Sequence, residues 1–240
     1  MKIANGLRHL WYLSAQKKAK PDSFVNWLRF VNAGMLNEGN IYCFEYVASN
    51  LPSENPIVEI GSFCGLSTNV INHYVRKANR ANRLITCDKW HFEGAENQDA
   101  FLESSNVTHG QYRQFTRETY IRNVRFFNQD RIPHTVEAFS SDFFELWDQA
   151  ATATDVIGRE IRLGGQISFA FIDGNHTYPF AKEDFLNVDK YLEKNGFILF
   201  DDSADYYTHF GVNRLVREIK EMDNYEIVIK NPNYLFRKIG

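Results

Sequence analysis

The sequence predicts an α/β fold, built as a doubly wound, mainly parallel sheet with helices on both faces. Short apolar runs alternate along the chain with longer segments of helical periodicity. These runs are nearly continuous, as expected for strands that are buried on both faces. Two further runs near the C-terminus, joined by a short turn, predict an antiparallel edge.

Composition and charge indicate one globular domain with additions. The chain has 240 residues, of which 44% are hydrophobic and 24% are charged, so it can bury a sizeable core. Its formal net charge is -3 and it has no long basic block, which argues against nucleic acid or an anionic membrane as partner. A small molecule is the expected ligand.

Cysteine usage and hydropathy predict the compartment. Cys43, Cys64 and Cys87 are scattered, odd in number and without a CxxC pair, so neither disulfides nor a structural zinc site is indicated. The stretch MKIANGLRHLWYLSAQKKAK lacks the apolar core of a signal peptide, and no later stretch approaches transmembrane length. We expect a soluble, cytoplasmic protein.

The first elements are a helical extension and a strand-helix-strand unit. Helical spacing from about Leu7 to Asn50 predicts a helical extension over residues 1–55, ahead of a main domain over residues 56–240. IVEIG is the first strand, Leu66 to Asn79 is a helix, and LITCD is the second strand. An insertion at about 89–130 holds a loop with a brief helix and then the longer helix YRQFTRETYIRNVRFFNQ. These additions are also compatible with a homo-oligomer.

The second half continues the alternation. HTVEAF is the third strand, and Asp142 with Glu145 resembles a capping box that opens the helix DFFELWDQA. ATATDVIGREIRLGGQ is expected to be irregular. ISFAFID and GFILFDD are the fourth and fifth strands, separated by a helix from Tyr178 to Lys194. After a helix near Val212 to Met222, YEIVIKNPNYLFRKI predicts two strands joined by a turn.

The carboxyl ends of the strands carry the functional information, because ligands of open parallel sheets bind there. Gly61 and Gly65 leave room for a ligand at a helix N-terminus, although a tight turn would explain both glycines equally well. Asp88, at the next strand end, can accept both hydroxyls of a ribose. Phe63 replaces the middle glycine of a dinucleotide fingerprint, so a cofactor without phosphates is favoured.

The fourth and fifth strands both end in carboxylates, at Asp173 and at Asp201-Asp202. Burying several acids together is costly without a partner, and oxygen ligands suit Mg²⁺. His176 follows closely and its imidazole could accept a proton. Helix capping or a solvated turn is the alternative for the paired acids, and a surface or capping role is the alternative for His176.

VEIGSFCGLST, the Cys87-Asp88 pair, FIDGNHTY and FILFDD resemble segments of class I S-adenosylmethionine-dependent methyltransferases. They are most similar to the metal-dependent O-methyltransferases that include catechol and macrolide-sugar enzymes. The resemblance covers about Pro56 to the C-terminus, outside the 89–130 insertion. It implies a seven-stranded Rossmann-like sheet with an antiparallel C-terminal strand, and an enzyme that methylates a hydroxyl of a small molecule or sugar.

The resemblance also implies roles for individual residues. Five positions would surround the methionine part of S-adenosylmethionine, Asp88 would bind its ribose, and two serines would touch its adenine. Mg²⁺ would be held by Asp173, Asp201 and Asp202, one of which might instead contact the cofactor, and His176 would act with Asp173 as the catalytic pair. The implied cofactor-binding residues are Glu59, Gly61, Ser62, Gly65, Ser67, Asp88, Ser140 and Ser141.

Three alternatives stay open at this point. One is a metal-independent methyltransferase, and another is a non-catalytic cofactor-binding or assembly protein of the same fold. The third is a cephalosporin hydroxylase-like protein, because such sequences share these motifs. The joint presence of Asp88, His176 and the strand-end acids favours catalysis, since a decayed site has no physical need for clustered acids.

Overall fold

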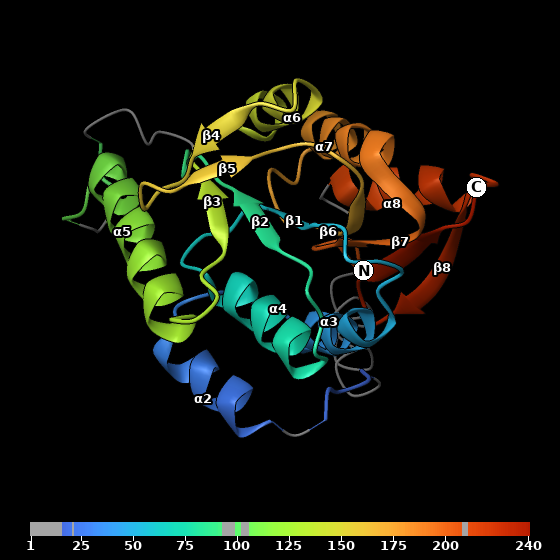
Figure 1. Ribbon diagram of the computed structural model, residues 1–240, viewed down its shortest axis with the longest axis horizontal. Coiled ribbons are helices and arrows are strands. Elements are labelled where there is room, and N and C mark those ends of the chain that lie inside the picture. Colours follow the sequence, from blue (N-terminus) through green and yellow to red (C-terminus); the bar gives the residue numbers. More distant parts are fainter. Residues whose placement is uncertain (1–15, 21, 93–98, 102–105, 208–210) are drawn as a thin grey trace, which may run out of the picture.

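Seven strands form the central sheet of the computed structural model, which describes residues 16–20, 22–92, 99–101, 106–207 and 211–240 (Figure 1). Their order across the sheet is β3-β2-β1-β6-β7-β9-β8. The strands are β1 (Ile57–Ile60), β2 (Leu84–Cys87), β3 (His134–Val136), β6 (Ile167–Ile172), β7 (Leu192–Phe200), β8 (Tyr225–Lys230) and β9 (Tyr234–Lys238).

The strand directions confirm the predicted doubly wound, mainly parallel sheet. Strands β3, β2, β1, β6 and β7 pair in parallel, whereas β9 runs antiparallel to both β7 and β8. The chain leaves β1 first toward β2 and β3 and later returns on its other side to β6 and β7. The carboxyl ends of β1 and β6 therefore flank the point where ligands bind in such sheets.

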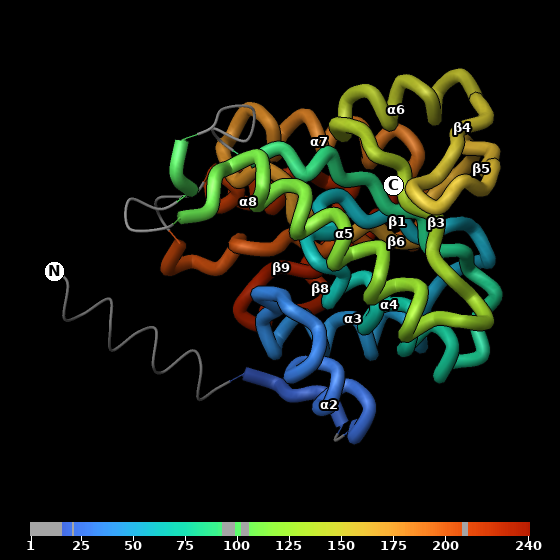
Figure 2. The backbone as a smooth tube through the Cα atoms, turned by 90° about the vertical axis from the view of Figure 1, so that its left-hand side faces the viewer, coloured from blue at the N-terminus to red at the C-terminus, as the bar shows by residue number. Residues whose placement is uncertain are grey.

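Helices cover both faces of the sheet (Figure 1). On one face lie α2 (Ser23–Val31), α3 (Glu38–Asn50) and α4 (Leu66–Lys77). On the other lie α6 (Ser140–Asp148), α7 (Tyr178–Tyr191) and α8 (Gly211–Lys220). Helix α5 (His109–Phe127) packs beside α4, near the β3 edge of the sheet, as Figures 1 and 2 show.

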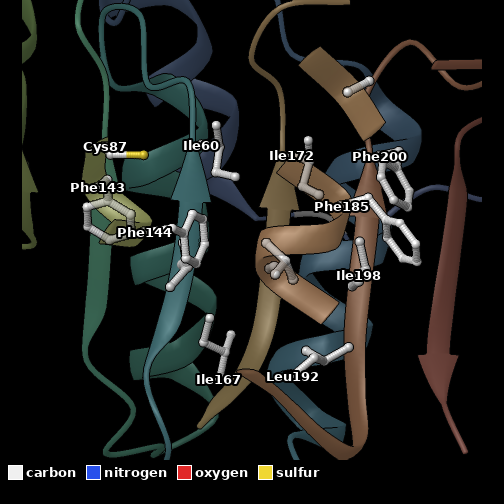
Figure 3. Close-up of a cluster of buried hydrophobic side chains, with 14 of the residues drawn as sticks. Ile60, Cys87, Phe143, Phe144, Ile167, Ile172, Phe185, Leu192, Ile198 and Phe200 are labelled. Atoms are coloured by element: carbon white, nitrogen blue, oxygen red, sulfur yellow. The ribbon is translucent and has the colours of Figure 1, made fainter. Parts of the chain in front are cut away.

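Side chains that alternate along the strands point into two separate hydrophobic cores, one on each face of the sheet. Val58 and Ile60 of β1 point into the core under α6 and α7, where Phe143 and Phe185 are fully buried (Figure 3). Ile57, on the opposite side of the same strand, belongs to the core under α3 and α4. Burying each such side chain stabilises the fold by about 1.5–3 kcal/mol, which explains why apolar residues predominate in these strands.

The N-terminal extension is attached to the sheet domain by α2 and α3, and the part of the predicted helix before residue 16 lies outside the described residues. Asp22 caps α2 by accepting hydrogen bonds from the N–H groups of Phe24 and Val25. The same carboxylate contacts His73 and Lys77 of α4 at 2.9 and 2.7 Å. Burial opposes ionisation of Asp22, but the hydrogen bonds from Lys77 and His73 outweigh it and lower the pKa of Asp22, and these contacts fix α2 against α4.

Two expectations for the second half were wrong. Helix α6 begins at Ser140 with Phe139 as its N-cap and without a side-chain cap, so Asp142 does not open it. The stretch expected to be irregular forms a small antiparallel hairpin of β4 (Thr152–Thr154) and β5 (Glu160–Arg162). These strands are only three residues long and mostly exposed, so they carry no apolar pattern.

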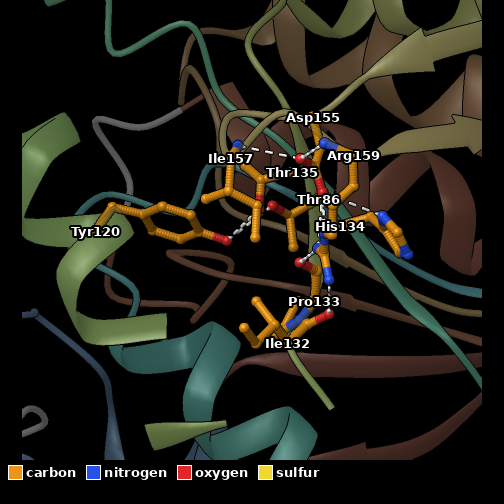
Figure 4. Close-up of polar contacts among 9 residues, drawn as sticks. All are labelled: Thr86, Tyr120, Ile132, Pro133, His134, Thr135, Asp155, Ile157 and Arg159. Atoms are coloured by element: carbon orange, nitrogen blue, oxygen red, sulfur yellow. Dashed lines mark hydrogen bonds and ion pairs between the residues drawn. The ribbon is translucent and has the colours of Figure 1, made fainter. Parts of the chain in front are cut away.

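A buried carboxylate fixes this hairpin beside β3 (Figure 4). Asp155 accepts hydrogen bonds from the backbone N–H groups of Ile157 and Arg159 and from the Arg159 guanidinium. The guanidinium also donates to the carbonyl oxygens of Ile132 and Pro133, just before β3.

Among the described helices, none is long and apolar enough to cross a membrane.

Candidate active site

A cavity of about 1330 Å³ opens at the carboxyl ends of β1, β2, β6 and β7. Pockets for one small molecule measure about 300–1,000 Å³, so this space can hold two ligands. Glu59 and Gly65 do not line the cavity, although the sequence predicted them as site residues. The predicted residues that do line it are Gly61, Ser62, Ser67, Asp88, Ser140, Ser141, Asp173, His176, Asp201 and Asp202.

The loop after β1 needs left-handed backbone at three positions. Gly61, Phe63 and Gly65 have φ values of 83°, 46° and 87°. A side chain at position 61 would come within 2.1 Å of the Asp173 carbonyl oxygen, so glycine lets β1 and β6 end side by side. The ring of Phe63 packs toward Phe92 at the cavity wall.

Asp88 organises this loop from the end of β2. Its Oδ2 accepts hydrogen bonds from the N–H groups of Ser62 and Phe63 at 2.8 and 2.9 Å, and its Oδ1 accepts one from Trp90 at 2.6 Å. Burial raises the pKa of Asp88, and these three bonds oppose that effect. Oδ2 is therefore saturated, and Oδ1 has one acceptor position left for a ligand.

Glu59 lies behind the cavity wall. Its carboxylate accepts hydrogen bonds from the hydroxyls of Ser67 and Thr68, both at 2.5 Å. Burial raises the pKa of Glu59 to about 7, against the effect of these two hydroxyl groups. Glu59 thus holds the first turn of α4 through Ser67 and Thr68, and of these two residues Ser67 lines the cavity.

The predicted acids of β6 and β7 come together with His176. The Nε2 atom of His176 lies 3.4 Å from Oδ1 of Asp173 and 3.5 Å from Oδ2 of Asp202. Burial, Asp201 and Asp202 all raise the pKa of Asp173, and the carboxyl groups of Asp173 and Asp201 are hydrogen-bonded to each other. Burial also raises the pKa of Asp201. Burial thus disfavours the charged forms of both carboxyl groups.

Two buried asparagines that the sequence analysis did not single out hold Asp201. Asn40 of α3 and Asn233 of the turn between β8 and β9 donate to its Oδ1 at 2.7 and 2.6 Å. Asn233 also donates to Oδ1 of Asn40 at 3.0 Å. Neither residue belongs to a motif, and Asn40 lies 161 positions away from Asp201, so local sequence offers no indication of the contact.

The remaining wall is formed by the first turn of α6 and by α7. Ser140 and Ser141 reach the cavity because α6 begins two residues earlier than expected. Asp184 of α7 interacts with Ser140 and is 2% exposed, and burial raises its pKa to about 6. The sequence analysis missed Asp184, because an acid within an amphipathic helix resembles a surface residue.

The fit of a metal ion depends on donor chemistry. Within the described part of the chain, no group of three or more His, Cys, Asp and Glu side chains is arranged as a ready metal site. The donors of the cluster are nevertheless mainly carboxylate oxygens, which suit Mg²⁺. The predicted Mg²⁺ stays a prediction.

Known structures share the fold of this chain. The O-methyltransferase TomG from Streptomyces achromogenes, solved with S-adenosylmethionine, is 14% identical with a TM-score of 0.56, over 96% of this chain and 95% of that one. The S-adenosylhomocysteine-bound methyltransferase PaMTH1 from Podospora anserina is 15% identical with a TM-score of 0.55, over 99% and 96%. The TDP-rhamnose 3'-O-methyltransferase CalS11 is 14% identical with a TM-score of 0.54, over 98% and 93%.

A family model described as a methyltransferase domain matches residues 58–203. None of the curated proteins matches the chain. The matched segment starts in β1, contains the glycine loop and Asp88, and ends just after the paired acids of β7. Because this match spans more than half of the chain, the protein belongs to the methyltransferase-domain family, with the fold of class I S-adenosylmethionine-dependent methyltransferases.

Proposed function

We propose that the protein is an S-adenosylmethionine-dependent O-methyltransferase, assisted by Mg²⁺, that acts on a hydroxyl of a small molecule or sugar. The observation that carries this proposal is the single cavity that joins the β1 loop to the acid cluster of Asp173, Asp201, Asp202 and His176. A cofactor site and a proton-accepting, oxygen-rich site thus lie within reach of each other. The structures of TomG and CalS11 support the assignment through their common fold.

Residues of the β1 loop and its neighbours would hold the cofactor. When bound, S-adenosylmethionine supplies an electrophilic methyl group. The N-terminus of α4 and Ser62 would face the methionine part of the cofactor. Oδ1 of Asp88 would accept a hydrogen bond from a ribose hydroxyl. Ser140 and Ser141 would lie at the adenine. A cavity wall rich in carboxyl groups favours a cationic sulfonium over a phosphate-bearing cofactor.

The acid cluster would hold Mg²⁺ through Asp173, Asp201 and Asp202. When bound, the ion neutralises these acids and lowers the pKa of an acceptor hydroxyl. His176 lines the cavity, with its Nε2 3.4 Å from Asp173 and 3.5 Å from Asp202, and its imidazole would take the hydroxyl proton. The carboxylates on either side would stabilise the imidazolium that forms.

The acceptor would enter beside the N-terminal extension. Residues 34–37, between α2 and α3, line the cavity together with Tyr207 and the acids. Met35 is 85% exposed at this rim, which gives an acceptor an apolar surface to contact. We also propose a cytoplasmic location, because Cys43, Cys64 and Cys87 are all free and buried.

Binding and transfer assays test the proposal together. S-adenosylhomocysteine should raise the melting temperature of the protein, whereas NAD should not. Methyl transfer to a panel of catechols and glycosides should require Mg²⁺ and stop when the ion is chelated. No stabilisation by S-adenosylhomocysteine would instead support an assembly protein that lost the chemistry.

Variants separate the roles within the site. Asp173→Ala and Asp201→Ala should abolish the dependence on Mg²⁺, and His176→Ala should lower turnover about 10²–10⁴-fold while cofactor binding is kept. Asp148→Ala is the matched control, because Asp148 is an exposed acid of α6 that pairs with Lys190. Unchanged turnover of the His176 variant would show that another group accepts the proton.

A further inference from the structure

The turn between β8 and β9 and the first turn of α3 meet at Asp201. Asn233 is fully buried and donates both amide hydrogens, one to Oδ1 of Asp201 at 2.6 Å and one to Oδ1 of Asn40 at 3.0 Å. Asn40 is also fully buried, and its amide nitrogen donates to Oδ1 of Asp201 at 2.7 Å. The three side chains thus form a closed ring of hydrogen bonds.

This ring fixes one oxygen of the Asp201 carboxylate, which also interacts with Asp173 and with the backbone of Asp202. A carboxylate oxygen accepts about two hydrogen bonds in good geometry, so Oδ1 of Asp201 is saturated by the two amides. Both donors are neutral, so they orient the carboxylate without cancelling its charge. A lysine or arginine in either place would have formed an ion pair and reduced the attraction for a metal cation.

Asn233 also fixes the backbone that follows the acids. Its Oδ1 accepts hydrogen bonds from the N–H groups of Ser203 and Ala204, both at 3.1 Å. The intervening Asp202 has left-handed backbone, with a φ of 49°, a conformation that aspartate adopts more readily than most residues other than glycine. Asn233 therefore fixes the turn that presents Asp202 toward His176.

The close approach of α3 to the β8–β9 turn depends on Gly39. A side chain at position 39 would lie 1.5 Å from the carbonyl oxygen of Asn231, so only glycine allows the two backbones to meet. Gly39 precedes Asn40 and places it against Asp201. The extension, which the family match does not cover, thus reaches the reactive acids.

We propose that Asn40 and Asn233 are positioning residues that hold Asp201 and Asp202 for a divalent cation, which makes α3 an integral part of the reactive centre. This inference rests on the proposed Mg²⁺ site. Hydrogen-bond partners behind metal ligands typically change metal affinity about 10–100-fold when they are removed. The same range is expected for Asn40→Ala and Asn233→Ala.

Mn²⁺ is the probe, because it prefers the same oxygen ligands as Mg²⁺ and its binding can be followed by electron paramagnetic resonance. The two variants should bind Mn²⁺ about 10–100-fold more weakly than the unmodified protein. Their affinity for S-adenosylhomocysteine should stay within about threefold, because that ligand contacts other residues. Melting temperatures are recorded for each variant.

Asn82→Ala is the matched control. Asn82 is fully buried and donates to the carbonyl oxygens of Ser53 and Asn55 and to the Ser168 hydroxyl, at the amino end of the sheet. Loss of the Asn82 amide group should lower the melting temperature of the variant but leave its affinity for Mn²⁺ unchanged. If Asn233→Ala does not fold, Asn40→Ala still decides, because Asp201 is the only acceptor recorded for its amide nitrogen among the described residues.

The outcomes are distinct. Weaker Mn²⁺ binding by the Asn40 and Asn233 variants alone supports the positioning role. An Mn²⁺ affinity equal to that of the unmodified protein, or reduced no more than in Asn82→Ala, overturns it. An unmodified protein that binds S-adenosylhomocysteine but not Mn²⁺ also overturns it while the methyltransferase assignment stands, and one that binds neither ligand overturns both.

Discussion

Replacing Glu59 by glutamine tests how the buried acid beneath the β1 loop affects stability. Burial moves the pKa of Glu59 from its ordinary value of 4.5 to about 7 in the folded protein. The folded state therefore binds this proton more tightly than the unfolded chain does. The contribution of Glu59 to the free energy of unfolding is therefore most favourable at low pH and becomes less favourable as the pH rises from about 4.5 to about 7.

The size of this effect follows from linkage. At pH 8 the ionised Glu59 lowers the free energy of unfolding by about 3 kcal/mol, and at pH 5 by about 1 kcal/mol. Glutamine has nearly the same shape and does not titrate, and its amide oxygen can accept from one of the two hydroxyls while its NH2 group donates to the other. The stability of Glu59→Gln relative to the unmodified protein should therefore improve by about 2 kcal/mol between pH 5 and pH 8.

Urea unfolding at both pH values, followed by circular dichroism, measures this change. Any loss from altered hydrogen bonding in the variant is the same at both pH values and cancels in the comparison. Glu145→Gln, an exposed substitution on α6, should show no such change. An offset between Glu59→Gln and the unmodified protein that does not depend on pH would refute a raised pKa at Glu59.

Three further predictions concern the hairpin, the loop and the acids. Asp155→Ala removes a fully buried carboxylate from the Arg159 guanidinium and should lower the free energy of unfolding by about 3–5 kcal/mol in a urea titration. Gly61→Ala should cost at least about 1–2 kcal/mol through its left-handed backbone alone, and calorimetry should show lost binding of S-adenosylhomocysteine. Protons compete with cations at Asp173, whose pKa is raised by burial and by Asp201, so Mg²⁺ should raise the melting temperature more at pH 8 than at pH 6.

The sheet could be predicted from sequence because its strands are buried on both faces. Runs such as ISFAFI are apolar at nearly every position because they face both cores, and this pattern is hard to confuse with a surface segment. The β4–β5 hairpin has no such requirement, since Thr152–Thr154 and Glu160–Arg162 lie on the surface and are stabilised by Asp155. Its stability comes from a contact that local sequence does not encode.

The start of α6 illustrates a competition between local and tertiary effects. Asp142 and Glu145 have the spacing of a capping box, but the helix extends back to Ser140. Asp184 of α7 interacts with Ser140 in the first turn of α6. A negative charge near a helix N-terminus is favourable, and here it comes from another helix instead of a preceding residue.

The strand-end acids could be predicted because topology alone brings them together, whereas their partners could not. Asp173 and Asp201 follow paired parallel strands, so their proximity is a consequence of sheet order. Asn40 and Asn233 reach the same point from a helix and a turn that the sequence places far away. Asparagine is common in turns and caps for local reasons, so its role here shows only in the folded chain.

The charge balance of the cavity connects these observations. Among the described residues that line it, six carry a carboxyl group, whereas Lys89 is the only lysine or arginine. Burial and mutual repulsion raise the pKa of Asp173, so part of this charge is suppressed by protons while cations are absent. A phosphate would add repulsion, whereas a sulfonium, an ammonium group and a divalent cation would each relieve it. The negative charge of the acids at the ends of β6 and β7 thus favours the binding of a cationic methyl donor in this cavity.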